Sequence, residues 1–350
     1  MPSFQATAIQ SNVRVVDNTA SKAEIKKTIK ENLNRALELI DWAAAYRYGA
    51  IQATGNPILI GLPESFLHGF PRSDGAQLAN MLKVAIEIPG EETERLAEKA
   101  RKYNAYIFGA SYSVEADWPN RYFNTGFIID PRGQVALKYR KINCGMIEAG
   151  TSPHDILDAY IERYGWEALF PVLETPIGRL SVLICADGLF GTEIARGMMM
   201  RGAEVLCYPI STTSPEHHYY HLAAQAHAYF NCCYLISPNL GRTFARERAA
   251  NTGGESVIVD FQGRILSTSR TTDESTITEM LHLEALRNYR LTAATGPVMI
   301  RAECFAPLYR QSFLPANFFL NQPEQSLADE VRVKKATLES LFERKILVRP

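Results

Sequence analysis

The sequence has almost no excess of charge of one sign. Lysine and arginine number 37 against 38 aspartates and glutamates, a formal net charge of -1, and no block of basic residues occurs. Nucleic-acid-binding proteins usually carry such an excess or block, so this class is excluded. No run reaches the roughly 18 to 20 apolar residues that a membrane-spanning helix needs. The first residues lack the basic and then apolar pattern of a signal peptide, so we expect a cytoplasmic protein without a nucleic-acid or membrane partner.

Cysteine and histidine are also scarce. The six cysteines are scattered without a CxxC pair, which excludes a disulfide framework and leaves at most one or two thiols for chemistry. The seven histidines form no HExxH motif. His217, His218 and His221 do place two imidazoles four residues apart on an expected helix, a spacing that can bind zinc. No set of further ligands accompanies them, so we expect no metal, and hydrolysis at a metal ion is an alternative.

What the sequence does contain is a regular alternation of strand and helix patterns, typical of α/β architecture. The 350 residues suffice for one large α/β domain or for two. Two similar hairpins are expected around Asp130 and Asp260, since both read apolar run, Asp-x-x-Gly, apolar run; this echo allows two similar sheets in one domain. Strands are expected at 4–10, 57–62, 105–112, 180–184, 205–209 and 233–238, and helices at 21–46, 90–103, 192–201 and 217–229.

The rhythm changes from about residue 291. Four prolines, at 297, 307, 315 and 323, divide this part into irregular pieces rich in aromatic residues, and an amphipathic helix is expected over 326–342. We therefore predict a first domain over 1–290 and a C-terminal arm over 291–350. The arm's apolar residues need burial, so it is expected to pack on a neighbouring chain or on its own core.

Three residues at the ends of predicted strands and hairpins can carry chemistry. Cys185 ends a buried strand before a turn, a placement that presents a nucleophile and lets backbone N–H groups face an oxyanion. Glu64 ends another strand and can act as general base, and Lys141 follows the first hairpin and can stabilise an anionic intermediate. Singly, each also fits an ordinary role: an inert core thiol, a solvated glutamate and an exposed basic cluster. Because a carboxylate near a thiol disfavours the thiolate, Asp187 is expected to cap the next helix or to position substrate.

The candidate residues occur within motifs that, together, resemble those of the nitrilase (carbon–nitrogen hydrolase) superfamily with its Glu-Lys-Cys triad. The motifs are Pro63-Glu64, Asn124-Thr125, Tyr139-Arg140-Lys141 and Cys185-Ala186-Asp187, and the resemblance covers about residues 4–290. Ile147-Glu148-Ala149-Gly150 is similar to the Ile-Glu-Gly of the aliphatic amidase and formamidase branch. True nitrilases typically have Cys-Trp-Glu at the cysteine. Phe66, His68 and Gly191-Thr192 depart from the branch.

The resemblance implies a role for each residue. It makes Cys185 the nucleophile, Glu64 the general base, and Lys141 with the N–H of Ala186 the stabilisers of the oxyanion; Glu148 holds the substrate amide and the attacking water, with Asp187 also near the substrate. A primary amide then becomes a carboxylic acid and ammonia through a cysteine thioester, without metal or organic cofactor. Nitriles and N-carbamoyl amides pass through the same thioester and remain alternatives, and a catalytically silent binding subunit is the alternative from another class.

The resemblance also implies architecture. The fold is expected to be a four-layer αββα sandwich with a C-terminal extension, and dimers are expected to build a homo-oligomer. The segment 152–169, which contains Tyr160, Tyr164 and Trp166, is longer than expected for enzymes of small amides. Lying between Lys141 and Cys185 in the sequence, it is expected to line the entrance of the pocket and to admit an amide larger than acetamide.

Overall fold

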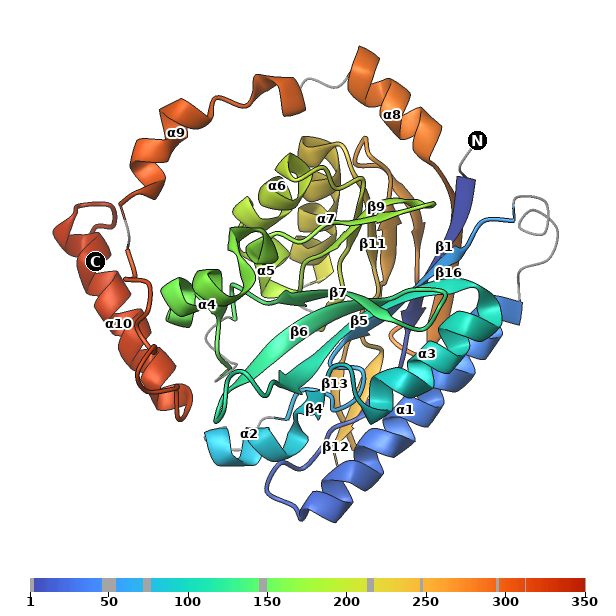
Figure 1. The fold of residues 1–350 in the computed structure, drawn as a ribbon, viewed down its shortest axis with the longest axis horizontal. Helices are drawn as coiled ribbons and strands as arrows, with labels where there is room; N and C mark the ends of the chain where they lie inside the picture. Colours follow the sequence, from blue (N-terminus) through green and yellow to red (C-terminus); the bar gives the residue numbers. More distant parts are fainter. Residues whose placement is uncertain are drawn as a thin grey trace.

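Two β-sheets of the same build lie at the centre of the computed structural model (Figure 1). The structure describes residues 3–45, 55–71, 77–144, 150–212, 217–245, 248–293, 296–311 and 313–349. The first sheet has the order β16 (Ser275–His282), β1 (Ser3–Gln10), β3 (Ile58–Glu64), β5 (Ala105–Val114), β6 (Tyr122–Ile129) and β7 (Val135–Arg140), with β4 (Ile86–Glu87) paired to β5. The second has the order β8 (Leu173–Thr175), β9 (Gly178–Val182), β10 (Val205–Cys207), β11 (Tyr234–Ser237), β14 (Val257–Val259) and β15 (Ile265–Thr268).

Each sheet has three parallel strands with antiparallel neighbours. Strands β1, β3 and β5 are parallel in the first sheet, as are β9, β10 and β11 in the second. An antiparallel hairpin, β6–β7 or β14–β15, follows in each. The ligand-binding edge of a parallel sheet is where its strands end, and Glu64 is the last residue of β3. A small third sheet joins β2 (Val13–Arg14), β12 (Arg242–Ala245) and β13 (Arg248–Thr252).

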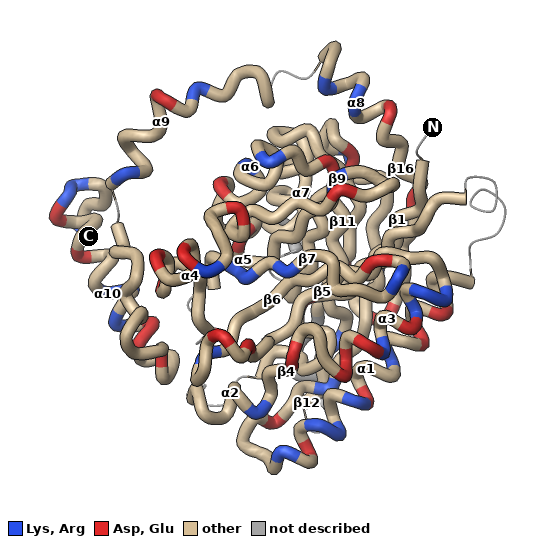
Figure 2. Tube along the Cα trace, viewed as in Figure 1, with Lys and Arg blue, Asp and Glu red and all other residues tan. Residues whose placement is uncertain are grey.

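Helices cover the outer faces of both sheets, which completes the predicted αββα sandwich. Helices α1 (Lys22–Ala45) and α3 (Glu91–Tyr103) lie on the first sheet, and α6 (Glu193–Met200) and α7 (His217–Asn231) on the second (Figure 1). Charged residues follow the exposed sides of α1 and α3 and are few along the central strands (Figure 2). Helix α1 begins at the predicted capping box, in which the Ser21 hydroxyl accepts from the Glu24 N–H at 3.3 Å and Glu24 accepts from the Ser21 N–H at 3.0 Å.

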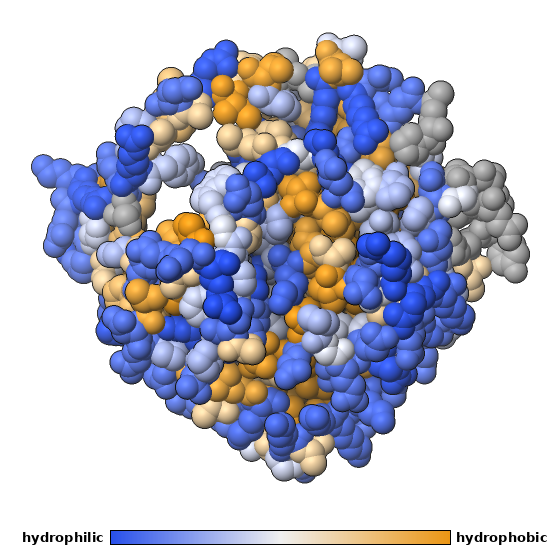
Figure 3. Space-filling model, viewed as in Figure 1, coloured by the Kyte–Doolittle hydropathy of each residue, from blue (hydrophilic) through white to orange (hydrophobic). Residues whose placement is uncertain are grey.

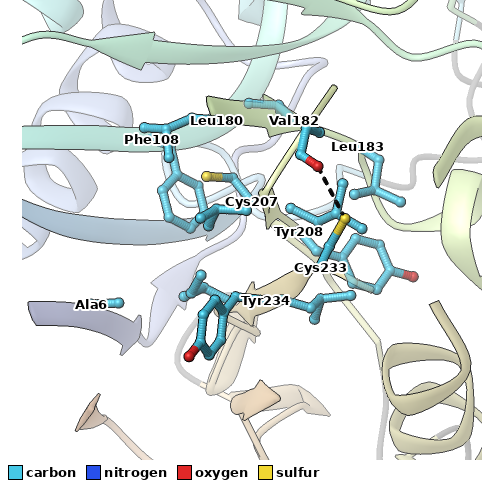
Figure 4. Close-up of a cluster of buried hydrophobic side chains, with 14 of the residues drawn as sticks. Ala6, Phe108, Leu180, Val182, Leu183, Cys207, Tyr208, Cys233 and Tyr234 are labelled. Atoms are coloured by element: carbon cyan, nitrogen blue, oxygen red, sulfur yellow. Dashed lines mark hydrogen bonds between the residues drawn. The ribbon is translucent and has the colours of Figure 1, made fainter. Parts of the chain in front are cut away.

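The core between the sheets follows the alternation of each strand. Phe4, Ala6 and Ala8 of β1 face the second sheet, whereas Ile9 belongs to the cluster under α1 and α3. Figure 4 shows Phe108 of β5 beside Cys207 and Leu180 of the second sheet. The sheets approach closely at Gly126 on β6, where an added Cβ would lie 2.5 Å from Cγ1 of Val182. The buried strands thus contribute to two cores, one between the sheets and one between the first sheet and helices α1 and α3.

The two predicted hairpins have turns of the same geometry. The N–H of Gly133 donates to the Asp130 carbonyl at 2.8 Å, and that of Gly263 to the Asp260 carbonyl at 2.9 Å. In both, the aspartate Oδ1 accepts two backbone N–H groups, at 2.9 Å and 2.9 Å around Asp130 and at 2.8 Å and 2.9 Å around Asp260. Both glycines have positive φ, 85° and 79°. The repeated Asp-x-x-Gly hairpin pattern allowed two similar sheets in one domain, and the structure contains them.

The C-terminal arm leaves the first sheet after its edge strand β16 and returns to the body elsewhere (Figure 1). It runs through α8 (Leu283–Thr292), η4 (Pro297–Met299) and α9 (Ala302–Tyr309) to α10 (Leu327–Glu343). The side chain of Ser326 caps α10 by accepting from the Ala328 N–H at 3.3 Å. The predicted boundary between residues 290 and 291 falls inside α8, and the division into two units stays a prediction. No helix in the described ranges is long and apolar enough to cross a membrane.

Candidate active site

Glu64 and Lys141 form a buried ion pair. Glu64 ends β3, Lys141 directly follows β7, and each is 1% exposed. The Lys141 Nζ lies 2.8 Å from the Glu64 Oε1. The structure therefore rules out the solvated glutamate and the exposed lysine. Charges this deeply buried are retained where they are paired and hydrogen-bonded, as here.

Asn124 on β6 holds both partners of this pair. Its Nδ2 donates to the Glu64 Oε1 at 2.8 Å, and its backbone carbonyl accepts from the Lys141 N–H at 2.9 Å. The sequence pointed to Asn124 only through the Asn-Thr motif and assigned it no role. The contact could not be derived from the sequence because it joins three strands.

The chain turns sharply at Cys185. Strand β9 ends at Val182, two residues earlier than predicted, and Cys185 has φ 40° and ψ -102°. A cysteine in this left-handed region is strained, and such strain concentrates at functional sites. The Cys185 N–H donates to the Pro209 carbonyl at 3.1 Å, and its carbonyl accepts from the Tyr208 hydroxyl at 2.8 Å. The half-buried thiol is thereby presented at a fixed turn.

Tyr208 connects the turn with the ion pair. Its ring is fully buried behind Cys185. Burial raises its pKa well above the usual value, and the nearby charges of Cys185, Asp187 and Glu64 raise it further. Tyr208 is therefore bonded to the Cys185 turn and lies within the electrostatic reach of Glu64. The only sequence signal for Tyr208 is its place at a strand end, after Cys207.

Asp187 ties the loop after Lys141 to the Cys185 turn. Its fully buried carboxylate accepts from the Tyr139 hydroxyl at 2.8 Å, the Asn143 N–H at 2.9 Å and the Ile184 N–H at 3.1 Å. Burial raises its pKa to about 6, against the opposing effect of these hydrogen bonds and of Lys141. The expected helix cap is wrong, since Cys185 and Thr192 stand at the N-caps of α5 (Ala186–Leu189) and α6.

Ala186 is the first residue of α5. The N–H groups of a first helical turn have no intrahelical acceptor, so the donor next to Cys185 suits an oxyanion. Glu148 lies outside the described residues, and its expected role stays a prediction.

His68, which departs from the branch pattern, fixes the turn that follows Glu64. Its Nδ1–H donates to the Gly69 carbonyl at 2.6 Å, its Nε2 accepts from the Tyr112 N–H at 3.1 Å, and its ring stacks on Tyr112 with centroids 4.3 Å apart. Burial lowers its pKa to about 4, so the ring is neutral. Ser65 starts this turn at φ 62°. His68 thus has a structural role behind the general-base candidate.

The metal alternative rests on His217, His218 and His221, and the side chains of His217 and His218 lie outside the described residues. No group of three or more described histidine, cysteine, aspartate or glutamate residues is arranged to hold a metal ion. The Nε2 atom of His221 on α7 is instead hydrogen-bonded to the Glu255 carbonyl oxygen, 2.9 Å away.

The 152–169 segment folds as η1 (Pro153–Ile156), α4 (Leu157–Tyr164) and η2 (Trp166–Leu169). Two of its aromatic residues pack around Arg140: Tyr160 is buried, and the Arg140 guanidinium donates to it at 3.1 Å and pairs with Glu115 at 2.5 Å. Tyr164 lies under the same guanidinium, 4.5 Å from ring centroid to Cζ. The start of the segment borders a cavity, which also touches the residues after Lys141.

Comparison with known proteins identifies the family of this chain. The family profile described as carbon-nitrogen hydrolase matches residues 8–291. The chain belongs to the carbon–nitrogen hydrolase family. This hydrolase is 31% identical over 264 residues to the omega-amidase NIT2 of Xenopus tropicalis, covering 74% of this chain and 86% of that one.

Two further proteins resemble the hydrolase more distantly. A formamidase of Pseudomonas syringae pv. syringae is 27% identical over 210 residues, which cover 60% of this chain and 55% of that one. The crystal structure of a carbon-nitrogen hydrolase from Helicobacter pylori superposes with a TM-score of 0.64 at 19% identity, covering 89% of this chain and 99% of that one, which shows a shared fold. The hydrolase is thus an amidase-like enzyme that acts on carbon–nitrogen bonds other than peptide bonds.

Proposed function

We propose that the hydrolase converts a primary amide into a carboxylic acid and ammonia through a thioester on Cys185. The observation that carries this proposal is the buried Glu64–Lys141 pair, 2.8 Å apart, whose glutamate shares Tyr208 as a neighbour with the strained Cys185 turn. A base, a fixed positive charge and a thiol at one place are what acyl transfer by a cysteine needs. The names of the two amidase relatives favour the same substrate class.

The first step forms the covalent bond. Glu64 takes the proton of the Cys185 thiol, and the sulfur attacks the amide carbon while the carbonyl π electrons move to the oxygen. Lys141 and the Ala186 N–H stabilise the resulting oxyanion. Removing one such preorganised donor raises the activation free energy by about 3 to 4 kcal/mol. Because Lys141 is held by Glu64 before substrate arrives, little reorganisation is needed at the moment of reaction.

The second step releases the products. The oxyanion collapses, the carbon–nitrogen bond breaks, and Glu64 returns its proton to the leaving ammonia. Glu64 then takes a proton from water, whose oxygen attacks the thioester, and Cys185 leaves as the thiol when that proton is returned to it. Glu148 is proposed to hold the amide and this water. Asp187 acts at a distance, by positioning the Lys141 loop and the Cys185 turn.

We further propose that two copies of the hydrolase associate through the arm and the outer helices. Helix α9 contains no buried residue. The space-filling view shows an opening between this stretch of the arm and the body (Figure 3). Apolar side chains exposed on the arm and on α6 and α7 include Met200, Leu222, Phe230, Val298, Met299, Phe305 and Leu308. So much exposed apolar surface is typical of an interface between protein chains.

Ammonia release from a panel of primary amides tests the assignment. We expect Cys185→Ala to abolish turnover, whereas Cys144→Ala, which changes a half-buried thiol beside the Lys141 carbonyl, keeps most of it. Iodoacetamide should inactivate the native enzyme and the Cys144→Ala variant alike. Full turnover by Cys185→Ala would contradict the proposal.

A further inference from the structure

The two carboxylate oxygens of Glu64 have different surroundings. Oε1 accepts from the Lys141 Nζ at 2.8 Å and from the Asn124 Nδ2 at 2.8 Å. No donor in the described part of the chain reaches Oε2. A cation and an amide that bind one oxygen stabilise its negative charge and occupy its lone pairs, so this oxygen is the poorer proton acceptor. As a base, Glu64 therefore has one occupied and one available oxygen.

Both donors reach Glu64 from the same side of the first sheet. The strand order there is β3, β5, β6 and β7, in which Glu64 ends β3, Asn124 lies on β6 and Lys141 follows β7. The Cys185 turn instead follows β9 of the second sheet. The Tyr208 hydroxyl, which donates to the Cys185 carbonyl, lies within electrostatic reach of both the thiol and Glu64. Oε1 is thus held towards β6 and β7, and Oε2 is left for the thiol.

The backbone around Asn124 holds its amide in place. Asn124 is 2% exposed and lies opposite Tyr112 in the antiparallel pairing of β5 with β6. Its carbonyl accepts from the Lys141 N–H at 2.9 Å, and the Tyr112 N–H donates to the His68 Nε2 at 3.1 Å. Since His68 also fixes the turn after Glu64, the amide and the carboxylate belong to one rigid framework. A group that is positioned before substrate arrives needs little reorganisation during the reaction.

We propose that Oε2 of Glu64 takes the Cys185 proton and that Asn124 is the positioning residue that keeps this oxygen turned to the thiol. This assignment of atoms rests on the proposed function. The S–H bond of Cys185 breaks as the Oε2–H bond forms, and the electron pair left on sulfur bonds to the amide carbon. Oε2 later returns the proton to the leaving ammonia. A carboxylate held by Lys141 alone could rotate and present either oxygen, which the second bond, from Asn124, prevents.

Asn124→Leu tests this assignment, because leucine keeps a branched side chain of similar size and lacks the amide. Ammonia release from acetamide, butyramide and hexanamide gives kcat and KM for those amides that the native enzyme hydrolyses. We expect kcat to fall about ten- to a hundredfold, as the displacement of a reacting group does. KM should stay within about threefold, because Asn124 acts through Glu64 and not on the substrate.

The pH profile separates positioning from a purely structural role. The Asn124 amide stabilises the ionised form of Glu64, so its loss should move the acidic limb of kcat/KM to higher pH. Ser113→Ala is the matched control, since it removes another buried hydrogen bond of β5 and β6, between the Ser113 and Thr125 hydroxyls at 2.7 Å. It should leave kcat, KM and the acidic limb as in the native enzyme.

Asn124→Asp keeps the test decisive if Asn124→Leu does not fold. The introduced carboxyl group has a similar size; when ionised it repels Glu64, and when protonated it can donate as the amide does. Its kcat relative to that of the native enzyme should therefore rise as pH falls.

Three results would overturn the inference and leave the amidase assignment standing. They are a native kcat and acidic limb in Asn124→Leu, a raised KM at unchanged kcat, and a profile of Asn124→Asp that follows the native enzyme at every pH. Failure of the native enzyme to hydrolyse any primary amide, or full turnover by Cys185→Ala, would instead contradict the proposed function.

Discussion

Asp187 makes the stability of the site dependent on pH at the scale of a single residue. In the unfolded chain an aspartate ionises near pH 4, whereas burial raises the folded-state pKa of Asp187 to about 6. The folded state therefore binds the extra proton between these values, and the contribution of Asp187 to stability falls as pH rises from about 4 to about 6 and is then constant.

The matched measurement is urea unfolding of the native enzyme and of Asp187→Asn across this range. We predict that the native enzyme loses about 2 kcal/mol relative to the variant between pH 4 and pH 7, as a shift of about two pKa units requires. A difference in unfolding free energy that does not change with pH would show that Asp187 is not buried as an ionisable group.

The sequence could predict the candidate site residues but not the contacts that hold them. Glu64, Lys141 and Cys185 follow from motif and position. The ordinary alternatives for Glu64 and Lys141 fail because both are buried against each other. The supporting contacts of Asn124 and Tyr208 join strands far apart in the chain, which local periodicity does not report.

At the scale of elements, the repeated hairpin turn depends on glycine at its last position. In Gly263→Ala the new Cβ would lie 3.0 Å from the Tyr229 Cβ and 3.1 Å from the Gln225 carbonyl oxygen, at φ 79°. The left-handed conformation alone costs a non-glycine residue about 1 to 2 kcal/mol. We predict a loss of that size in urea unfolding, at an unchanged denaturant slope.

Gln262→Ala is the control for this turn, because the bond at this position runs from the backbone N–H to Asp260 and survives the change. Its effect should stay within about 0.5 kcal/mol. If Gly263→Ala were equally neutral, the shared turn would not need its glycine.

Most elements were predictable because each carries its own pattern, and the hairpin echo allowed two similar sheets, but the order of the strands within them was not predicted. Nor was the end of β9, since Leu183 and Ile184 continue the apolar run after the strand has ended. The N–H groups of Leu183 and Cys185 still donate to the Cys207 and Pro209 carbonyls along β10, and the chain turns away at Cys185, where φ is 40°. That backbone conformation is not visible in the apolar pattern.

At the scale of the whole molecule, the exposed apolar residues of the arm predict self-association. Phe305 and Leu308 on α9 are 54% and 60% exposed. We predict by light scattering that the native enzyme has at least twice the 39.1 kDa mass of one chain. Introducing Phe305→Glu and Leu308→Glu together should reduce it toward a single chain, because buried charges at an interface are costly.

Val348→Glu changes an equally apolar residue, 88% exposed beyond α10, and should leave the mass unchanged. A native mass of one chain, or a double variant that assembles fully, would contradict the proposed interface.

The return of the arm to the body could not be predicted from composition, which asks only that its apolar residues be covered. Whether a second chain or the body of the same chain covers them depends on tertiary contacts, such as the hydrogen bonds from Arg121 to the Phe319 and Leu320 carbonyls.

The acyl group itself is the most direct test of the mechanism. Native enzyme quenched during turnover of a primary amide should carry the acyl mass on the peptide that contains Cys185, as should Cys144→Ala, and Cys185→Ala should carry none. Acylation of Cys144, or turnover in Cys185→Ala without a labelled peptide, would contradict a thioester at Cys185.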